Sequence, residues 1–342
     1  MPADSAIDTF IAELPKVELH VHLEGSLQPA TLLELAEKHR IEGLPASLEA
    51  VEGWYAFRDF PHFIKVYEQA VRALRDEEDF ALLAERTASN LAAQNVRYAE
   101  VIVSLQSHLL RGIPAHVVFA GIEQGRRRAE REHGIRLRWI PDFAGHLGAD
   151  GGETTLDAVL EAGPASVIGF GVGAIEVERD QFRDVFDRAR AAGLRSLPHA
   201  GETEGPERVW SAIRVLRAER IGHGIGGMTD PRLVEYLRDG QLPVDVSPTS
   251  NLRTRVVPTL AEHPLPRMID AGLLVTLNSD DPPMFGTDLL REYHVAHEMG
   301  LGPRDLAALA RNGVTASFLE PPTRTALTDE IDTVLARREV VA

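Results

Sequence analysis

The sequence predicts an α/β fold in which a (β/α)8 barrel, the TIM barrel, carries a helical cap inserted after its first strand. Short apolar segments rich in β-branched residues alternate with longer helical patterns, which is typical of parallel βα units. Eight such segments are present, and the last five begin about 20 to 30 residues apart, which leaves room for one crossover helix in each step. Because a chain of 342 residues fits one barrel with insertions, we expect a single domain over residues 1–342.

The predicted elements follow one another along the chain. The eight strands are expected at residues 16–23, 96–104, 135–143, 167–172, 195–200, 220–223, 243–247 and 273–279. Helices are expected at residues 181–192, 206–216, 231–240 and 263–271, and a final amphipathic helix at residues 323–338. The interval of residues 25–95 is too long for one crossover, and we expect it to form the cap.

Aromatic residues recur within this interval at helical spacing. Phe57, Phe60, Phe63 and Tyr67 are three or four positions apart, so a helix here would present them on one face. That face either covers the mouth of the barrel or packs within the core of the cap itself.

Composition excludes several classes of protein. The 36 basic and 52 acidic residues give a net charge of −16, which provides no broad cationic surface for nucleic acid or for an anionic membrane. The chain has no cysteine, so disulfides, thiolate metal sites and thiol nucleophiles are excluded and any metal must rest on histidine and carboxylate. Neither a signal peptide nor an apolar run of about 18 residues is present, and we expect a cytoplasmic protein.

The first predicted strand contains a pair of histidines at alternating positions. His20 and His22 share one face of the segment VELHVHL, and their Cα atoms would lie about 6 to 7 Å apart, so both can bind one ion. Active sites of barrels gather at the carboxyl ends of the strands, where these two residues are placed. Taken alone, the pair could equally be two exposed histidines on an edge strand.

Three other predicted strand ends carry ionisable residues. The fifth strand ends in His199 and is followed by Glu202, the sixth ends in His223, and the eighth is followed by Asp280 and Asp281. Three imidazoles and one carboxylate suit zinc and leave a coordination position for water. Although carboxylates at such positions can also cap the next helix, the convergence of several strand ends favours a metal site.

These segments resemble the adenosine deaminase family of metal-dependent aminohydrolases. The resemblance runs from about residue 16 to residue 319 and rests on five motifs in order, which are HVHLEGSL, HAGE, RIGHG, SPTSN and NSDDP. It implies a barrel with one divalent ion, usually zinc, that activates water to attack C6 of a 6-aminopurine with release of ammonia.

The resemblance implies a role for each matching residue. It makes His20, His22, His199 and Asp280 the metal ligands. Glu202 would protonate purine N1 as general acid, and His223 would orient the attacking water, although His223 could instead be purely structural. Asp281 would share that water or accept a hydrogen bond from a protonated purine N7. Against the substrate the resemblance places His22, Glu24, Ala174 and Asp281.

Two positions depart from the adenosine-specific pattern, and both concern the substrate. Glu24 stands where adenosine deaminases typically carry the aspartate that accepts from the ribose 5′-hydroxyl, and glutamate there resembles the deaminases of adenine and of 6-amino-6-deoxyfutalosine. The longer side chain could also simply reach the same hydroxyl. Ala174 stands where a glycine amide usually contacts purine N3, and alanine keeps that N–H. The same stretch, GFGVGAIE, loosely matches a dinucleotide-binding pattern, but no cofactor unit surrounds it.

We therefore expect an enzyme that deaminates a 6-aminopurine nucleoside, so its partner is a small molecule. Among the substrates, 6-amino-6-deoxyfutalosine of menaquinone synthesis is favoured, adenosine is second and adenine is third. The alternatives are another metal-dependent barrel hydrolase and a purine-binding protein without activity. Many related hydrolases use two metals bridged by a modified lysine, and residues 169–174 contain no lysine. The oligomeric state stays open.

Overall fold

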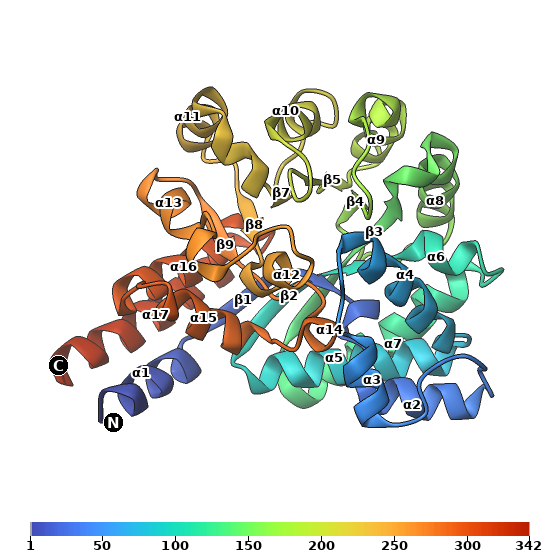
Figure 1. Ribbon diagram of the computed structural model, residues 1–342, viewed down its shortest axis with the longest axis horizontal. Coiled ribbons are helices and arrows are strands. Elements are labelled where there is room, and N and C mark those ends of the chain that lie inside the picture. Colours follow the sequence, from blue (N-terminus) through green and yellow to red (C-terminus); the bar gives the residue numbers. More distant parts are fainter. Residues whose placement is uncertain (1, 342) are drawn as a thin grey trace.

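The structure, a computed structural model, describes residues 2–341 and consists of short parallel strands surrounded by helices (Figure 1). The strands are β1 (Lys16–His22), β2 (Val96–Val103), β3 (Arg136–Ala144), β4 (Gly169–Gly173), β5 (Arg195–Ser196), β6 (His199–Ala200), β7 (Ile221–His223), β8 (Val244–Val246) and β9 (Val275–Leu277). Every strand pair is parallel, and the strands form two ladders in chain order, β1 to β5 and β6 to β9.

Each of the eight predicted segments contains a strand, and the fifth is divided into β5 and β6. Leu197 and Pro198 separate the two parts, and proline has no N–H to donate to a ladder. The chain still runs between both neighbours, because Leu197 N donates to Phe170 O at 3.1 Å and Pro198 O accepts from Gly222 N at 3.0 Å. The fifth strand thus joins the two ladders.

The first strand also contacts the segment that follows the last strand. Val21 and Asp280 form a parallel bridge, in which His22 N donates to Asp280 O at 2.8 Å and Asp280 N donates to His20 O at 3.0 Å. The order of strands and crossovers is that of a (β/α)8 barrel, as predicted, although the hydrogen-bonded ladder is not continuous around the ring.

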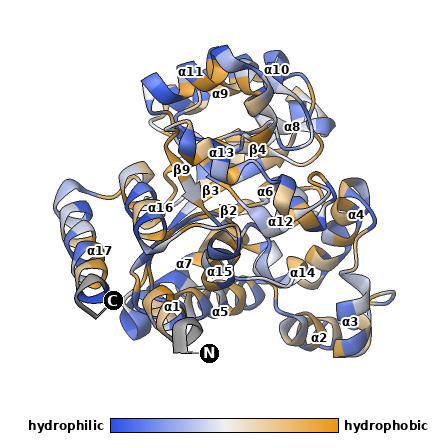
Figure 2. Cartoon of the chain, turned by 60° about the vertical axis from the view of Figure 1, so that its left-hand side comes forward, coloured by the Kyte–Doolittle hydropathy of each residue, from blue (hydrophilic) through white to orange (hydrophobic). Residues whose placement is uncertain are grey.

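Helices cover the outside of the strands. In Figure 1, α8 (Ala149–Ala162), α9 (Arg183–Ala191), α10 (Pro206–Arg214), α11 (Pro231–Gly240), α13 (Leu265–Asp270) and α16 (Pro303–Ala316) surround the strand layer. The predicted helices at 181–192, 206–216, 231–240 and 263–271 correspond to α9, α10, α11 and α13, with ends that differ by a few residues. Hydrophilic residues lie on the outer turns of α10 and α11, as expected for amphipathic helices against a core (Figure 2).

The interval of residues 25–95 contains helices, as predicted, and these fall into two groups. Along the chain they are α2 (Pro29–Lys38), α3 (Leu48–Trp54), α4 (Phe60–Ala70) and α5 (Glu77–Ala93). α5 packs tightly along α7 (Ala115–His133), because a Cβ at Gly121 would lie 2.4 Å from Glu77 O and one at Gly125 would lie 2.4 Å from Ala81 O. α5 therefore lies among the outer helices of the barrel, and α2, α3 and α4 are the helices that stand apart.

The two ends of the described chain lie near each other (Figure 1). α1 (Pro2–Glu13) packs against α17 (Pro321–Val341), where Arg338 Nη1 donates to Ala6 O at 2.6 Å. The predicted C-terminal helix is confirmed as α17, which buries the narrow stripe of Leu327 and Ile331. No helix among residues 2–341 has the length and apolar character needed to cross a membrane.

Candidate active site

The carboxyl ends of the strands bring together the residues predicted as metal ligands. β1 carries His20 and His22 on one face, β6 begins with His199, and Asp280 follows β9. Asp280 Oδ1 lies 3.4 Å from Nε2 of both His20 and His22, and the Nε2 atoms of His22 and His199 are 3.3 Å apart. Four side chains from three separate segments therefore converge on one point.

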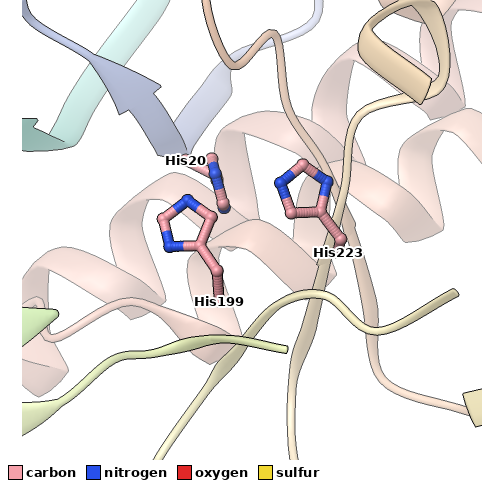
Figure 3. A group of neighbouring side chains, drawn as sticks. All are labelled: His20, His199 and His223. Carbon is pink, nitrogen blue, oxygen red and sulfur yellow. The ribbon is translucent and has the colours of Figure 1, made fainter. Parts of the chain in front are cut away.

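His223, at the end of β7, lies in the same cluster. The rings of His20, His199 and His223 face one another in Figure 3, with ring centroids 4.5 to 5.4 Å apart. These three histidines also form a group whose nitrogens lie within 4.8 Å of one another. His223 Nδ1 is 3.3 Å from Asn251 Nδ2, and its Nε2 is 3.6 Å from Glu202 Oε2. Its position suits either a contact with an ion or a contact with a neighbouring water.

The histidine and aspartate cluster has the properties of a cation site. His20 Nε2, His22 Nδ1 and His199 Nδ1 are buried without a hydrogen-bond partner, whereas buried polar atoms are normally paired. Burial lowers the pKa of His22 to about 4 and that of His199 well below its usual range, so both rings are neutral and keep a lone pair for a metal. The residues present therefore fit a divalent ion held by nitrogen and oxygen.

Asp280 completes the cluster as an ionised carboxylate. Burial by itself favours its protonation, but the neighbouring imidazoles, His20 first among them, hold the pKa well below its usual range. Asp280 Oδ2 also accepts from Ser250 Oγ at 2.6 Å. The backbone of Asp280 and that of His223 have φ of 65° and 63°, and such rare conformations concentrate at functional sites.

Glu202 is held beside this cluster by a second buried carboxylate. Glu176, which follows β4, accepts hydrogen bonds at 2.8 Å from the backbone N–H groups of Gly201, Glu202 and Thr203. Burial raises the pKa of Glu202 well above its usual range, and the charges of Asp280 and Glu176 raise it further. The raised pKa favours the protonated form of Glu202, which suits a proton donor.

Asp281 is the second acid with a raised pKa. Burial is the main cause, and the charge of Asp280 adds to it. Its Oδ1 atom has no hydrogen-bond partner. A Cβ on Gly25 would lie 1.7 Å from this oxygen, so only glycine permits the close approach of the segment after β1.

A cavity of about 640 Å³, including its open mouth, lies over the cluster. It is lined by the predicted site residues His22, Ala174, His199, Glu202, His223, Asp280 and Asp281. Ala174 has a φ of 61°, in the left-handed region that favours glycine.

Helix α4 forms part of the cavity wall. It begins after Asp59, whose carboxylate caps the helix by accepting from His62 N at 2.8 Å. Phe60, Phe63 and Tyr67 line the cavity, as one of the two alternatives predicted. Phe57 lies before the helix and packs on Phe63, in line with the other alternative. Both alternatives are thus partly realised.

Glu24 is not among the residues that line the cavity. It is fully buried, and both of its carboxylate oxygens have protein partners. Oε1 lies 2.7 Å from His108 Nε2, and Oε2 accepts from Ser104 N at 3.1 Å and from the Tyr67 hydroxyl at 3.3 Å. Burial favours the protonated form, but the hydrogen bond with His108 and the other partners lower the pKa of Glu24 below its usual value. The carboxylate lies behind the wall of the cavity.

Sequence reasoning gave no role to several residues that hold the site together. Glu176, Ser250 and Asn251 lie in stretches that carry the family resemblance, so their neighbours in the sequence were the available signal. Asp142, in β3, lines the cavity. No pattern in the sequence marks it.

Comparison with known proteins places the chain in a family. A family model described as adenosine deaminase matches residues 15–334. The chain belongs to the adenosine deaminase family. As a member of this family it is a hydrolytic aminohydrolase, and the family, together with a structural neighbour that holds zinc, implies a metal at the histidine and aspartate cluster.

Individual relatives of this deaminase cover nearly the whole chain. An aminodeoxyfutalosine deaminase of Streptomyces avermitilis is 47% identical over 335 residues, with 96% of this chain and 94% of the relative covered. One of Streptomyces coelicolor is 48% identical, covering 96% and 87%. An adenine deaminase of Streptomyces coelicolor is 40% identical over 312 residues, covering 90% and 91%.

Solved structures of the family share the fold of this deaminase. The adenine deaminase of Arthrobacter aurescens superposes with a TM-score of 0.91 and 33% identity, covering 94% of this chain and 98% of that one. An amidohydrolase of Burkholderia ambifaria with bound zinc gives a TM-score of 0.89 and 26% identity, covering 98% and 95%.

Proposed function

We propose that this enzyme hydrolyses the 6-amino group of 6-amino-6-deoxyfutalosine and releases ammonia, as a step of menaquinone synthesis. The observation that carries the reaction class is the position of Glu202, a buried acid with a raised pKa that lines the same cavity as His22, His199 and Asp280. The substrate rests on the greater similarity to aminodeoxyfutalosine deaminases, at 47% and 48% identity, than to the adenine deaminase at 40%. The adenine deaminases make adenine the second candidate.

The residues that would hold the metal are His20, His22, His199 and Asp280. Zinc suits this set because it accepts imidazole and carboxylate ligands and tolerates an open position. When bound, zinc supplies a Lewis acid that lowers the pKa of a coordinated water toward about 7. Zinc-bound protein with one ion per chain is therefore the expected active form.

Glu202 performs the general acid step in this proposal. Its proton, retained because burial raises its pKa, passes to N1 of the purine as water adds to C6. Protonation at N1 makes C6 more electrophilic, and the addition of water to C6 then removes the aromatic character of the ring. A positioned acid of this kind contributes about 10²- to 10⁴-fold to the rate.

His223 and Asp281 orient the attacking water. Burial lowers the pKa of His223 to about 3, so its ring is neutral; because Asn251 Nδ2 donates to Nδ1, the ring proton lies on Nε2, which can donate to the oxygen of the water. Asn251 holds the other side of the ring, and His263 Nε2 holds Asn251 Oδ1 at 3.1 Å. Asp281 Oδ1, which has no partner in the protein, is available to that water or to N7 of the substrate. The attacking water passes one proton through Asp281 to the amino group, which leaves C6 as ammonia, and the hydroxyl proton of the adduct returns to Glu202 as the C6 carbonyl forms.

The first test compares purine substrates. Zinc-loaded protein is assayed by ultraviolet absorbance, with ammonia release measured in parallel, against 6-amino-6-deoxyfutalosine, adenosine and adenine. The highest kcat/KM is expected for the first compound. A clear preference for adenine would replace the proposed substrate with the second candidate, and no deamination of any of the three by protein holding one metal per chain would refute the proposal.

The second test addresses the acid. Glu202→Gln is expected to keep one metal per chain and to lower kcat by about 10² or more, because the amide cannot donate an acidic proton. Glu204→Gln is the matched control, since this glutamate lies on the same loop with an exposed side chain. Near-normal turnover of Glu202→Gln would show that the acid lies elsewhere.

A further inference from the structure

The cavity contains one buried carboxyl group that the reaction does not use. Asp142 projects from β3, is only 5% exposed and lines the cavity. The other acidic residues of the lining are Glu202, Asp280 and Asp281, which have assigned roles, and Glu68, which is exposed on α4.

Asp142 lies beside the residue expected to contact the purine. A Cβ at Gly173 would lie 3.2 Å from Asp142 Oδ2 and 3.3 Å from His199 Nδ1, so the carboxyl group and the imidazole approach the same glycine. The next residue is Ala174, whose N–H is expected at purine N3. Because N3 and N9 are both bonded to C4, a group near N3 lies close to the glycosidic side of the base.

A chain of polar side chains extends behind Asp142. The hydroxyl of Ser104 interacts with Asp142 and lies 2.9 Å from the Tyr67 hydroxyl, which donates to Glu24. Glu24 interacts with His108, Ser104 and Tyr67 and does not line the cavity. The carboxyl group that remains available on this side of the cavity is that of Asp142.

We propose that Asp142 hydrogen-bonds to a sugar hydroxyl of the substrate and thereby makes the enzyme select nucleosides over free purine bases. This inference rests on the proposed function of the site. The Asp142 carboxyl group interacts with the Ser104 hydroxyl and lines the cavity, so its oxygens remain within reach of a ligand. A hydroxyl both donates and accepts, so it pairs with the carboxyl group in either protonation state.

The electrostatics of Asp142 agree with this role. Burial raises its pKa well above its usual value, and the charge of Glu24 raises it further. A raised pKa favours the neutral carboxyl group, for which a neutral sugar hydroxyl is a suitable partner.

The experiment is a double-mutant cycle between protein and ligand. Affinities of the zinc-loaded wild type, Asp142→Ala and Asp142→Asn are measured by calorimetry for inosine, 2′-deoxyinosine, 3′-deoxyinosine and hypoxanthine, which are reaction products or their analogues. Wild type is expected to lose about 10-fold or more in affinity when the contacted hydroxyl is removed. Asp142→Ala should bind inosine more weakly than wild type by a similar factor. Its affinity for the deoxyinosine that lacks the contacted hydroxyl should not fall further, and its affinity for hypoxanthine should change less than about 3-fold.

Glu178→Gln is the matched control, because it removes an exposed carboxylate that does not line the cavity. Metal content and thermal unfolding show whether each variant is intact. If Asp142→Ala misfolds, the isosteric Asp142→Asn provides the same comparison. Equal losses for hypoxanthine and inosine, or wild type that binds hypoxanthine as tightly as inosine, would overturn the inference. The proposed function is tested separately by turnover of wild type, so the two can fail independently.

Discussion

Replacement of Glu176 tests how the turn that carries Glu202, the proposed catalytic acid, is held in place. The Glu176 side chain is 1% exposed, and its two oxygens accept from the backbone N–H groups of residues 201–204, with three of these bonds at 2.8 Å. In Glu176→Gln one oxygen becomes an NH2 group. If the amide oxygen keeps the three backbone donors of Oε1, the NH2 group faces the N–H of Gly201, which is buried.

The expected loss follows from that mismatch. A hydrogen bond to a charged group is worth about 1.5–3 kcal/mol, and a buried donor without a partner costs about 1–3 kcal/mol. We therefore expect Glu176→Gln to lower the free energy of unfolding by roughly 2.5–6 kcal/mol. Because Glu202 lies on the same turn, kcat should fall about 10- to 100-fold, which corresponds to about 1.4–2.8 kcal/mol of transition-state stabilisation.

Urea unfolding and steady-state kinetics at constant metal loading measure the two effects. Glu178→Gln is the control, because this glutamate is 71% exposed and pairs with Arg208 at the surface, where such pairs contribute about 0–1 kcal/mol. If Glu176→Gln behaved like Glu178→Gln in both assays, the carboxylate would not be what positions the acid. A loss of stability with unchanged kcat would show that it supports the fold but not Glu202.

Two further substitutions have predicted effects on stability. Burial raises the pKa of Glu292 to about 7. Between about pH 4.5 and 7 the native state therefore retains a proton that the unfolded state has lost. The free energy of unfolding falls as pH rises through this window, by up to roughly 3 kcal/mol. Glu292→Gln can keep the contacts with Thr249 and Thr287. In urea unfolding, the free energy of unfolding of the variant should therefore increase relative to that of wild type between pH 5 and pH 8. An equal difference between the two proteins at both pH values would contradict this. Ala174→Gly should raise the free energy of unfolding by about 0.5–1 kcal/mol, because it relieves a left-handed alanine at φ 61° but adds entropy to the unfolded chain; thermal unfolding that shows a loss would mean that contacts of the methyl group outweigh the strain.

The sequence was sufficient to predict the histidine and aspartate cluster because its geometry follows from periodicity. Alternation along a strand places His20 and His22 on one face, and parallel strands in a barrel bring their carboxyl ends to one rim. Once His199 and Asp280 were assigned to strand ends, no further information was needed to predict that they lie close to His22. Both lie within 3.4 Å of His22.

The surroundings of the substrate depended on tertiary structure. Glu24 was expected against the substrate, yet it lies behind the cavity wall because His108, 84 residues further along the chain, and Tyr67 and Ser104 occupy its oxygens. Asp142 was not expected at all, because one acid in an apolar strand carries no pattern of its own.

The division between these two kinds of feature has a physical origin. Local spacing determines which face of a strand or helix a side chain occupies, so fold class, strand order and the histidine and aspartate cluster could be predicted from the 342 residues alone. The direction of a side chain beyond a strand end depends on hydrogen bonds and close contacts with segments distant in the sequence. Those contacts place Asp142 in the cavity and Glu24 outside it, and they were decided only by the packing of the folded chain.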